Sequence, residues 1–415
     1  MSEKKNVPKL RFPEFTEPWE QRKFSDLVET RRGLTYKPTD IREKGVRVLR
    51  SSNIDEDRFV LKPDDVFVDE SAINIGFVKE NDILITAANG SSRLVGKHAI
   101  VSEISDKSTV HGGFMLLGTS DEPYFANAFI SSAWYKRFID LYVLGGNGAI
   151  GNLNKSDLDD QDILVPQKKE QQAIGHFFEN LDRLITLHQR KLDHVKDLKK
   201  SMLQKMFPKK GQLYPKVRFP EFTDPWEQRK FSDLVETRRG LTYKPTDIRE
   251  KGVRVLRSSN IDEDRFVLKP DDVFVDESAI NIGFVKENDI LITAANGSSR
   301  LVGKHAIVSE ISDKSTVHGG FMLLGTSDEP YFANAFISSA WYKRFIDLYV
   351  LGGNGAIGNL NKSDLDDQDI LVPQKKEQQT IGHFFENLDN LITLHQRELY
   401  HLKLLKKGML QQMFV

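Results

Sequence analysis

A glycine-rich stretch, GGNGAIG, occupies residues 145–151 and recurs at residues 352–358. The six residues from Gly146 to Gly151 fit the pattern G-x-G-x-x-G, which holds a dinucleotide phosphate when it joins a strand to a helix. Similar glycine-rich turns hold the methyl donor of methyltransferases. One hypothesis is therefore a cofactor-dependent enzyme, either a methyltransferase or an oxidoreductase, with one site in each stretch.

The residues around GGNGAIG argue against a dinucleotide. The preceding segment, WYKRFIDLYVL, has the pattern of a helix end, whereas a dinucleotide site needs a strand there. The segment after Gly151, NLNKSDLDDQDILVP, has turn residues followed by a strand-like run. Glycine also allows a backbone to approach a ligand closely. We therefore interpret the stretch as a loop that faces a ligand or as a tight turn.

Other catalytic patterns are missing from the sequence. The chain has no cysteine, which excludes disulfides, thiolate metal sites and cysteine nucleophiles. Its histidines show neither the H-E-x-x-H pattern nor another paired metal-ligand spacing. The Asn/Asp-Pro-Pro-aromatic signature of amino-methylating enzymes is also absent. The sequence predicts no catalytic residue, no bound cofactor and no metal site.

The dominant feature of the chain is an internal repeat. Residues 8–208 align with residues 215–415 at a constant offset of 207, without a gap and with eleven differences. Residues 18–172 match residues 225–379 at every position. A period of this length indicates a duplicated domain rather than a solenoid unit. Two identical domains on one chain can bind two identical targets.

Each copy has two parts with different patterns. The first part mixes strand-like runs, such as VRVLRSS (46–52) and DILITAA (82–88), with turn residues, and it includes one expected helix at 123–142. The second part has no proline and one glycine before residue 207, and its apolar residues recur every three or four positions. This pattern predicts a helix of about 40 residues, roughly 60 Å long.

A single apolar stripe on so long a helix needs a long partner, and the helix expected at 374–414 provides one. The sequence thus predicts an α+β fold with two globular domains separated by two long helices, packed as an antiparallel coiled coil with pseudo-two-fold symmetry. The expected divisions are residues 1–166 (first domain), 167–208 (central helix), 209–217 (linker), 218–373 (second domain) and 374–415 (C-terminal helix).

Composition fits a soluble protein. Hydrophobic residues make up 39% of the chain, charged residues 29%, and the net charge is −1. No apolar run approaches the ~20 residues of a membrane span. The N-terminal sequence MSEKKNVPKLRF lacks the apolar core of a signal peptide. The expected location is the cytoplasm, with no membrane partner.

The order of these parts resembles the specificity subunit of type I restriction-modification systems. The resemblance rests on RFPEFTEPWEQRKFSDL (11–27), ILVPQKKEQQAIGHFFENLDRLI (163–185) and LKKSMLQKMF (198–207), each of which recurs in the second copy. It covers essentially the whole chain. It implies that each globular part is a target-recognition domain for one half of a bipartite site in double-stranded DNA, and that the helices set the gap between the halves.

The resemblance also implies partners. Two methylation subunits and two restriction or motor subunits would complete the complex, and S-adenosylmethionine, ATP and Mg would bind to those partners. The specificity subunit itself has no catalytic step. Because the two domains are identical, we expect an inverted-repeat target with identical half-sites. The alternative is a cofactor-dependent DNA methyltransferase that uses the GGNGAIG loops.

The candidate DNA contacts share two properties: they are basic or carry amide or hydroxyl groups, and they lie in expected loops. Arginine can bind guanine with two hydrogen bonds, asparagine can do the same for adenine, and serine and lysine more often hold phosphates. In the first copy they are Arg31, Arg32, Tyr36, Lys37, Arg50, Asn53, Asn89, Ser91, Ser92, Arg93, Lys97, Asn147, Asn152, Asn154 and Lys155. In the second copy they are Arg238, Arg239, Tyr243, Lys244, Arg257, Asn260, Asn296, Ser298, Ser299, Arg300, Lys304, Asn354, Asn359, Asn361 and Lys362.

The two long helices differ along one stripe. Asp193, Asp197 and Ser201 of the first copy correspond to Tyr400, Leu404 and Gly408 of the second. Residues four positions apart share a helix face. One explanation is drift on an exposed face. The other is that this stripe of the C-terminal helix packs against a segment that the central helix does not meet, which predicts that Leu404 is buried.

Overall fold

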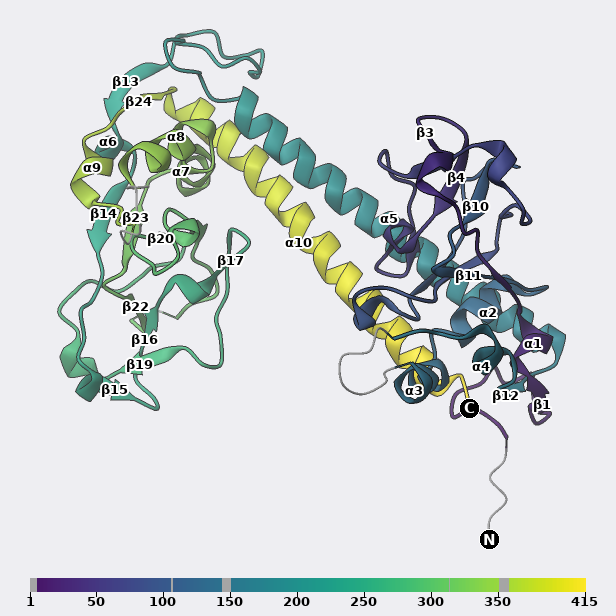
Figure 1. The fold of residues 1–415 in the computed structure, drawn as a ribbon. Coiled ribbons are helices and arrows are strands. Elements are labelled where there is room, and N and C mark those ends of the chain that lie inside the picture. The colour runs from purple at the N-terminus through teal and green to yellow at the C-terminus, as the bar shows by residue number, and fades with distance from the viewer. Residues whose placement is uncertain (1–5, 106, 144–150, 313, 351–357) are drawn as a thin grey trace. The chain divides into compact units, whose positions relative to one another are not determined.

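A computed structural model describes residues 6–105, 107–143, 151–312, 314–350 and 358–415 of the chain (Figure 1). The chain forms two compact units, Met1–Gln189 with Arg397–Val415, and Arg190–Gln396. Each unit contains one globular domain of helices and strands together with parts of both long helices, α5 (Lys168–Lys205) and α10 (Lys375–Gln412).

The elements of the two domains correspond one to one. The strands of the first domain are β1 (Glu20–Lys23), β2 (Glu29–Arg32), β3 (Ile41–Arg42), β4 (Val46–Leu49), β5 (Ile54–Asp55), β6 (Arg58–Phe59), β7 (Val66–Val68), β8 (Ile83–Thr86), β9 (His98–Ile100), β10 (Thr109–His111), β11 (Met115–Thr119) and β12 (Asp162–Val165). Its helices are α1 (Phe24–Leu27), α2 (Pro123–Phe129), α3 (Ala133–Tyr142) and α4 (Lys155–Asp159).

The second domain repeats this order. Its strands are β13 (Glu227–Lys230), β14 (Glu236–Arg239), β15 (Ile248–Arg249), β16 (Val253–Leu256), β17 (Ile261–Asp262), β18 (Arg265–Phe266), β19 (Val273–Val275), β20 (Ile290–Thr293), β21 (His305–Ile307), β22 (Thr316–His318), β23 (Met322–Thr326) and β24 (Asp369–Val372). Its helices are α6 (Phe231–Leu234), α7 (Pro330–Ile337), α8 (Ala340–Tyr349) and α9 (Lys362–Asp366).

Two four-stranded sheets organise each domain. In the first domain, one sheet has the order β2-β11-β8-β9 and is antiparallel throughout. The other has the order β10-β4-β7-β3, in which only the β10–β4 pair is parallel. The pairs β1–β12 and β5–β6 are two-stranded. The second domain has the same strand orders and pairings.

Strand β8 separates two hydrophobic cores. All four of its residues are buried. Alternate side chains of a strand point to opposite faces, so both faces of β8 are covered. Ile83 and Ile85 join the core that includes α2 and α3, whereas Leu84 joins Met115 and Leu117 of β11 in a second core. An uninterrupted apolar run such as ILIT is typical of a strand covered on both faces.

The prediction of a single helix at 123–142 is wrong in one respect, because the structure has two helices there. Helix α2 ends at Phe129, and α3 begins at Ala133 after the N-cap residue Ser132, whose backbone is extended. The Ser131 hydroxyl donates to the backbone oxygen of Asn127 at 2.8 Å. Serine side chains compete for backbone groups in this way and favour helix ends.

Each domain core is closed by the long helix of the other copy. The C-terminal residues Leu410, Met413 and Phe414 belong to the same core as Trp19 and Phe125 of the first domain. In the second domain, the equivalent positions are filled by Met206 and Phe207. A backbone hydrogen bond of 2.9 Å from the Leu10 amide to the Gln412 oxygen fixes the helix end, and Val217 bonds to Lys205 in the same way at 2.9 Å.

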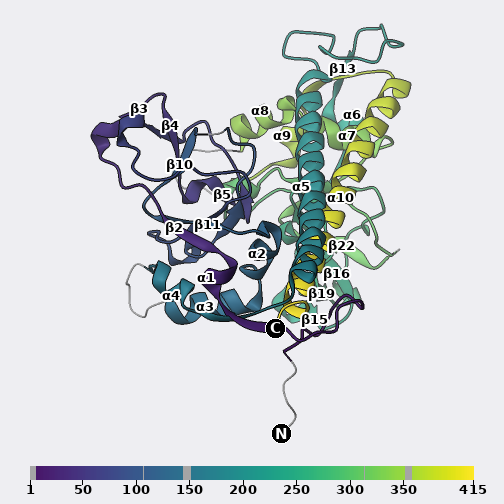
Figure 2. The same ribbon diagram turned by 90° about the vertical axis from the view of Figure 1, so that its right-hand side faces the viewer.

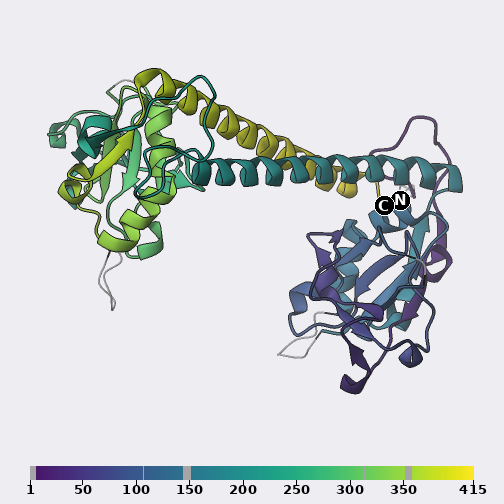
Figure 3. The same cartoon turned by 90° about the horizontal axis from the view of Figure 1, so that it is seen from above.

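The long helices run antiparallel within each unit (Figure 2, Figure 3). In the first unit, Asp182 near the start of α5 pairs with Lys406 near the end of α10 at 2.6 Å. In the second unit, Lys199 near the end of α5 pairs with Asp389 near the start of α10 at 2.5 Å. The expected apolar stripe is confirmed, because its members are buried or half-buried: Ile174, Phe178, Leu181, Ile185, Leu192, Val195, Met202 and Met206.

The larger side chains of the stripe that differs between the helices are exposed. Asp197 is exposed, and the Leu404 side chain that replaces it is 53% exposed. Tyr400 is also exposed. The hypothesis that this stripe packs against another segment of the chain is therefore wrong for the described residues.

Candidate nucleic-acid interface

Backbone hydrogen bonds gather five segments of the first domain at one edge. The Leu34 amide donates to the His111 oxygen at 2.7 Å, and the Gly112 amide to the Leu49 oxygen at 2.9 Å. The Ala87 amide donates to the Phe114 oxygen at 2.9 Å, while its own oxygen accepts from Leu153 at 2.7 Å. We call this edge the loop edge; it comprises residues 33–36, 50–53, 87–93, 112–114 and 151–155.

Glycine is required where these segments touch. A Cβ atom on Gly33 would lie 2.0 Å from the Gly112 oxygen, which is far inside van der Waals contact. A Cβ on Gly113 would lie 3.1 Å from the Thr35 hydroxyl oxygen. The glycines of RRGLTY and HGGF therefore allow the segments after β2 and β10 to pack backbone against backbone.

The two arginines of β2 have different surroundings. Arg32 is exposed, as is the nearby Lys37. Arg31 pairs at 3.3 Å with Asp82, a buried carboxylate that also accepts hydrogen bonds from the Thr119 hydroxyl at 2.7 Å and the Lys79 amide at 2.9 Å. Arg31 thus neutralises a buried charge, which favours a structural role over DNA contact.

A histidine beside Arg31 is held neutral. His111 Nε2 lies 3.2 Å from the Arg31 backbone oxygen, and the side chain is buried. Burial lowers the pKa of His111 to about 4, although the backbone contact with Arg31 opposes the shift. His318 in the second domain has the same pKa for the same reason. These histidines carry no charge near neutral pH.

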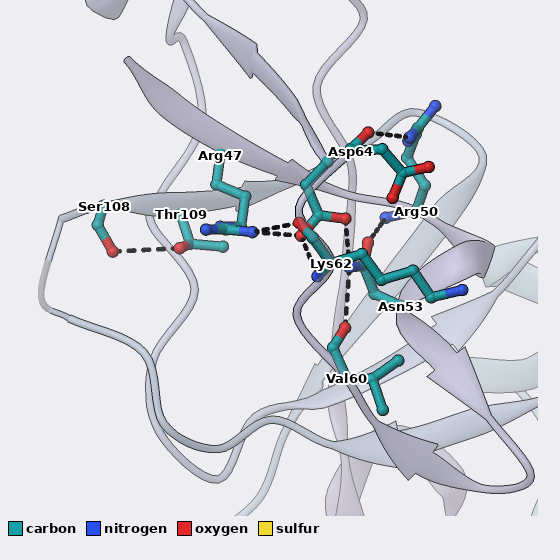
Figure 4. A network of polar contacts seen from close by, with 9 residues as sticks. Arg47, Arg50, Asn53, Val60, Lys62, Asp64, Ser108 and Thr109 are labelled. Carbon is teal, nitrogen blue, oxygen red and sulfur yellow. Dashed lines mark hydrogen bonds and ion pairs between the residues drawn. The ribbon is translucent and has the colours of Figure 1, made fainter. Parts of the chain in front are cut away.

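Asn53, predicted from the sequence to contact DNA, is buried and hydrogen-bonded within its own domain. Its side chain is fully buried and accepts from the Arg50 amide at 2.8 Å. Its amide group donates to the Val60 oxygen at 2.9 Å and to Asp65 Oδ1 at 2.8 Å (Figure 4). Asp65 is in turn paired with Arg47. Asn260 of the second domain is equally buried and bonded, so both residues shape the loop, and this structural role argues against direct base contact.

This network orients Arg50 at the loop edge. Arg50 is half-buried, and one of its terminal nitrogens lies 3.5 Å from the Asp64 oxygen (Figure 4). A Cβ on Gly112 would lie 3.9 Å from Arg50 Cγ, so the aliphatic stem lies against the glycine turn. The charged end has only this long polar contact among the described residues, which leaves it suited to a phosphate or a base.

The segment 89–97 joins the same edge. The Asn89 amide group donates to the Ser51 hydroxyl at 2.9 Å, and Asn89 Oδ1 accepts from the Ser91 amide at 2.9 Å. Ser91, Ser92 and Arg93 are exposed, whereas Lys97 is half-buried. The hydrogen bond between Asn89 and Ser51 therefore connects the candidates of segment 89–97 to the segment that contains Arg50 and Asn53.

The candidates at residues 147–155 have different surroundings. Asn152 is exposed and its backbone bridges to Ala88. Asn154 bonds to Asp157 at 3.0 Å at the start of α4, and Lys155 pairs with Asp159 one helical turn away. Asn154 and Lys155 thus stabilise α4. Asn147 and Asn354 lie outside the described residues.

The second domain reproduces these placements. Arg238 pairs with Asp289 at 3.2 Å, Asn296 bonds to Ser258 at 2.9 Å, and Lys362 pairs with Asp366. Asn361 bonds to Asp364 at 3.1 Å. Its exposed candidates are Arg239, Lys244, Ser298, Ser299, Arg300 and Asn359; its half-buried ones are Tyr243, Arg257, Asn296 and Lys304. Tyr36 is likewise half-buried and packs beside a small apolar core.

One cluster was not predicted from the sequence. Glu170, in the first turn of α5, is almost fully buried and forms two hydrogen bonds of 2.7 Å with Arg11. The Trp19 ring nitrogen donates to it at 3.3 Å. The contact with Glu170 raises the pKa of Arg11. Glu377, Arg218 and Trp226 repeat the cluster. The sequence contained one indication of this cluster: the segments that carry Arg11, Trp19 and Glu170 recur in the second copy.

Comparison with known proteins places the chain in a family. The model described as "Type I restriction modification DNA specificity domain" matches residues 16–197 and again residues 223–404. Together the two matches span most of the chain. The chain belongs to the family of type I restriction modification DNA specificity domains. It is therefore a DNA-recognition subunit, and catalysis lies on partner subunits.

Relatives of similar length support the assignment. The chain is 25% identical over 391 residues to the type I restriction enzyme EcoKI specificity subunit of Escherichia coli K12, covering 90% of this chain and 82% of that one. It is 22% identical over 344 residues to the MjaVIII specificity subunit of Methanocaldococcus jannaschii, covering 80% and 77%. The fold matches a crystal structure of a type I S subunit from M. genitalium with a TM-score of 0.64, 16% identity and 99% coverage of both chains.

The described residues hold neither a candidate metal-binding cluster nor a candidate membrane-spanning helix. Among the residues that the structure describes, no group of three or more His, Asp or Glu side chains could hold a metal ion. Within the same residues, no helix has the length and apolar character needed to cross a bilayer. Helix α3 ends at Tyr142, shortly before the segment 144–150, so the prediction that this segment follows a helix is confirmed.

Proposed function

We propose that each domain recognises one half of a bipartite DNA target, and that the two half-sites are identical and inverted. The observation that carries the proposal is that residues 18–172 and 225–379 are identical. The contacts at the loop edge repeat as well: the Asn89–Ser51 and Asn296–Ser258 bonds are both 2.9 Å long. Side chains of the same type, held in the same way, select the same bases.

The antiparallel course of α5 and α10 supports an inverted arrangement. On this proposal, identical readers joined to antiparallel helices would read the same sequence on opposite strands. A helical connection of fixed length then fixes the number of unread base pairs, as half-site spacing follows dimer geometry in other DNA-binding proteins. The Glu170 and Glu377 clusters would hold each helix at a fixed angle to its domain.

Two methylation subunits and two restriction subunits would bind this chain. S-adenosylmethionine would bind to the methylation subunits, and ATP and Mg to the restriction subunits. The exposed leucines of the long helices, among them Leu184, Leu187, Leu391 and Leu394, offer apolar surface for helices of such partners.

Methylome sequencing of a strain that expresses this chain with its methylation subunit tests the target. We expect one methylated motif made of two identical, inverted half-sites around a fixed gap. A motif with two unlike half-sites would refute the proposal, because identical domains cannot read different sequences in equivalent settings. The Arg93→Ala and Arg300→Ala variants provide a matched pair, and each is expected to relax or weaken recognition of one half-site.

A binding assay separates recognition from other roles. The complex with methylation subunits is expected to bind the motif selectively, and its affinity is expected to fall steeply with salt because phosphate contacts release counterions. Binding that is independent of salt would oppose DNA recognition by this surface. Binding of S-adenosylmethionine to the purified chain alone would instead favour the methyltransferase alternative.

A further inference from the structure

A single aromatic side chain projects from the loop edge of each domain. Phe114 and its duplicate Phe321 are each 75% exposed. Within the described part of the chain they are the only phenylalanines among the exposed large hydrophobic residues. The residues on either side of the turn, His111 and Met115, are buried. The ring therefore leaves the domain at the tip of a turn between β10 and β11, whose residues are mostly buried.

The backbone beneath this ring is held firmly. The Phe114 carbonyl accepts hydrogen bonds from the amides of Ala87, at 2.9 Å, and Ala88, at 3.0 Å. The Met115 amide closes the turn by donating to the Gly112 oxygen at 2.8 Å. The Gly112 amide is bonded to the end of β4. A ring on such a backbone loses little conformational freedom when it binds, since only two side-chain angles remain to be fixed.

The turn that carries the ring lies beside polar residues. The atoms nearest to Cβ positions built on Gly112 and Gly113 include side-chain atoms of Arg50 and Thr35 as well as of Val48. Thr35, Gly113 and Gly90 are exposed, and Ser51 and Asn89 are half-buried and bonded to each other. A protein-docking surface is usually a contiguous apolar patch. A lone ring among amide, hydroxyl and guanidinium groups instead suits a partner with stacked aromatic faces and negative charge.

We propose that Phe114 and Phe321 each insert between stacked bases of a bound half-site. This inference rests on the proposed function, because it requires DNA at the loop edge. Apolar side chains that enter a base step unstack it partly and kink the duplex. Arg50, whose aliphatic stem lies against the Gly112 turn, would hold a phosphate beside the opened step. Because the turn is duplicated, the unstacked step occurs at the same position in both half-sites.

The test uses the full chain in complex with its methylation subunits. The probe is a fluorescently labelled duplex that carries the motif mapped by methylome sequencing. Fluorescence anisotropy gives the affinity, and permanganate, which oxidises unstacked thymines, maps the opened step when the motif or its flank contains thymine or has been substituted with it. Phe114→Ala and Phe321→Ala are compared with Phe114→Trp, which keeps an aromatic face, and with Ile41→Ala, which removes another exposed apolar side chain of the same domain.

The expected result has three parts. Each alanine variant weakens motif binding roughly 5- to 150-fold, the range of aromatic–base stacking. Each loses permanganate reactivity in one half-site and keeps it in the other. Phe114→Trp and Ile41→Ala keep both the affinity and the reactive step.

The outcomes distinguish the two proposals. Absence of selective binding by the unaltered complex means that the proposed function fails. Selective binding with unchanged affinity and reactivity in the alanine variants overturns only the insertion. Weaker association of the methylation subunits in the absence of DNA, measured by sedimentation of Phe114→Ala, also overturns it, because the ring would then contact protein.

Discussion

Replacing Phe414 with alanine is expected to destabilise the first unit and leave the second unchanged. Phe414 packs in the core of the first domain, with ring-centroid distances of 6.1 Å to Trp19, 5.9 Å to Phe125 and Phe129, and 6.0 Å to Phe178. Truncating a core phenylalanine costs about 3–5 kcal/mol, because apolar contact is lost and a cavity remains. A unit of about 200 residues then melts at a temperature lower by about 6–20 °C.

Scanning calorimetry of the full chain provides the assay. The two units have nearly identical cores, so the unaltered chain is expected to melt over one narrow range. Phe414→Ala is expected to divide this transition into an early and a late component of similar enthalpy. Phe207→Ala should give the same profile from the other unit, and Tyr400→Ala, which truncates an exposed side chain of the same helix, should leave one transition. A single, undivided transition at the original temperature in Phe414→Ala would refute closure of the first core by α10.

Two further predictions concern charge. Glu170→Ala and Glu377→Ala are each expected to lower the free energy of unfolding of their unit by about 3–5 kcal/mol, since each leaves a partly buried arginine unpaired. Denaturant titration should give equal losses of stability for the two variants. Unequal losses would contradict the equivalence of the two clusters. His111 and His318, with pKa values of about 4 in the folded chain and 6.5 as the reference, favour the folded state fully above pH 6.5. As the pH falls from 6.5 towards 4, the unfolded state takes up the proton first, and each histidine removes about 3 kcal/mol of stability. Denaturation at a series of pH values should show that the free energy of unfolding of His111→Gln declines less steeply with falling pH than that of the unaltered chain. An unchanged slope would show that protonation of His111 does not destabilise the folded state.

Periodicity was sufficient to predict much of the fold. Every strand-like run that we quoted contains an observed strand, for example β4 within 46–52 and β8 within 82–88. The 3.6-residue pattern predicted both long helices, because each buries one continuous stripe. The break between α2 and α3 was missed, since the apolar spacing continues across Ser131–Ser132 and only the local serine bonds end the first helix.

The closure of each core by the other helix was not predicted. A local pattern shows that Met413 and Phe414 are apolar, but it does not show which surface receives them. That surface combines Trp19, Phe125 and Phe178, which are far apart in the sequence. Only the tertiary arrangement reveals that the last turn of α10 completes a domain that begins some 400 residues earlier.

The candidate site was predicted from residue type. Residue type alone does not distinguish side chains that are free to contact DNA from side chains that stabilise the domain. Arg31 and Arg32 are adjacent in β2, yet one faces a buried aspartate and the other is exposed. Asn53 has the chemistry to bind adenine, but its hydrogen-bonding groups are engaged by Arg50, Val60 and Asp65. Phe114 was overlooked because an apolar residue beside a strand is usually assigned to the core.

The positions that differ between the two copies bear directly on recognition. None of the eleven differences lies at a buried position in either copy. The residues that enter the opposite core, Met206 and Phe207 in one helix and Met413 and Phe414 in the other, are the same. The loop edges lie within the identical residues 18–172 and 225–379, so they cannot make the two readers unequal, and the differing residues Tyr400 and Leu404 lie exposed on the helix. A difference in behaviour between the halves would then come from the differing positions outside residues 18–172 and 225–379, which lie at Leu10/Val217, at Glu17/Asp224 and along or just after the long helices, and not from the bases that the domains select.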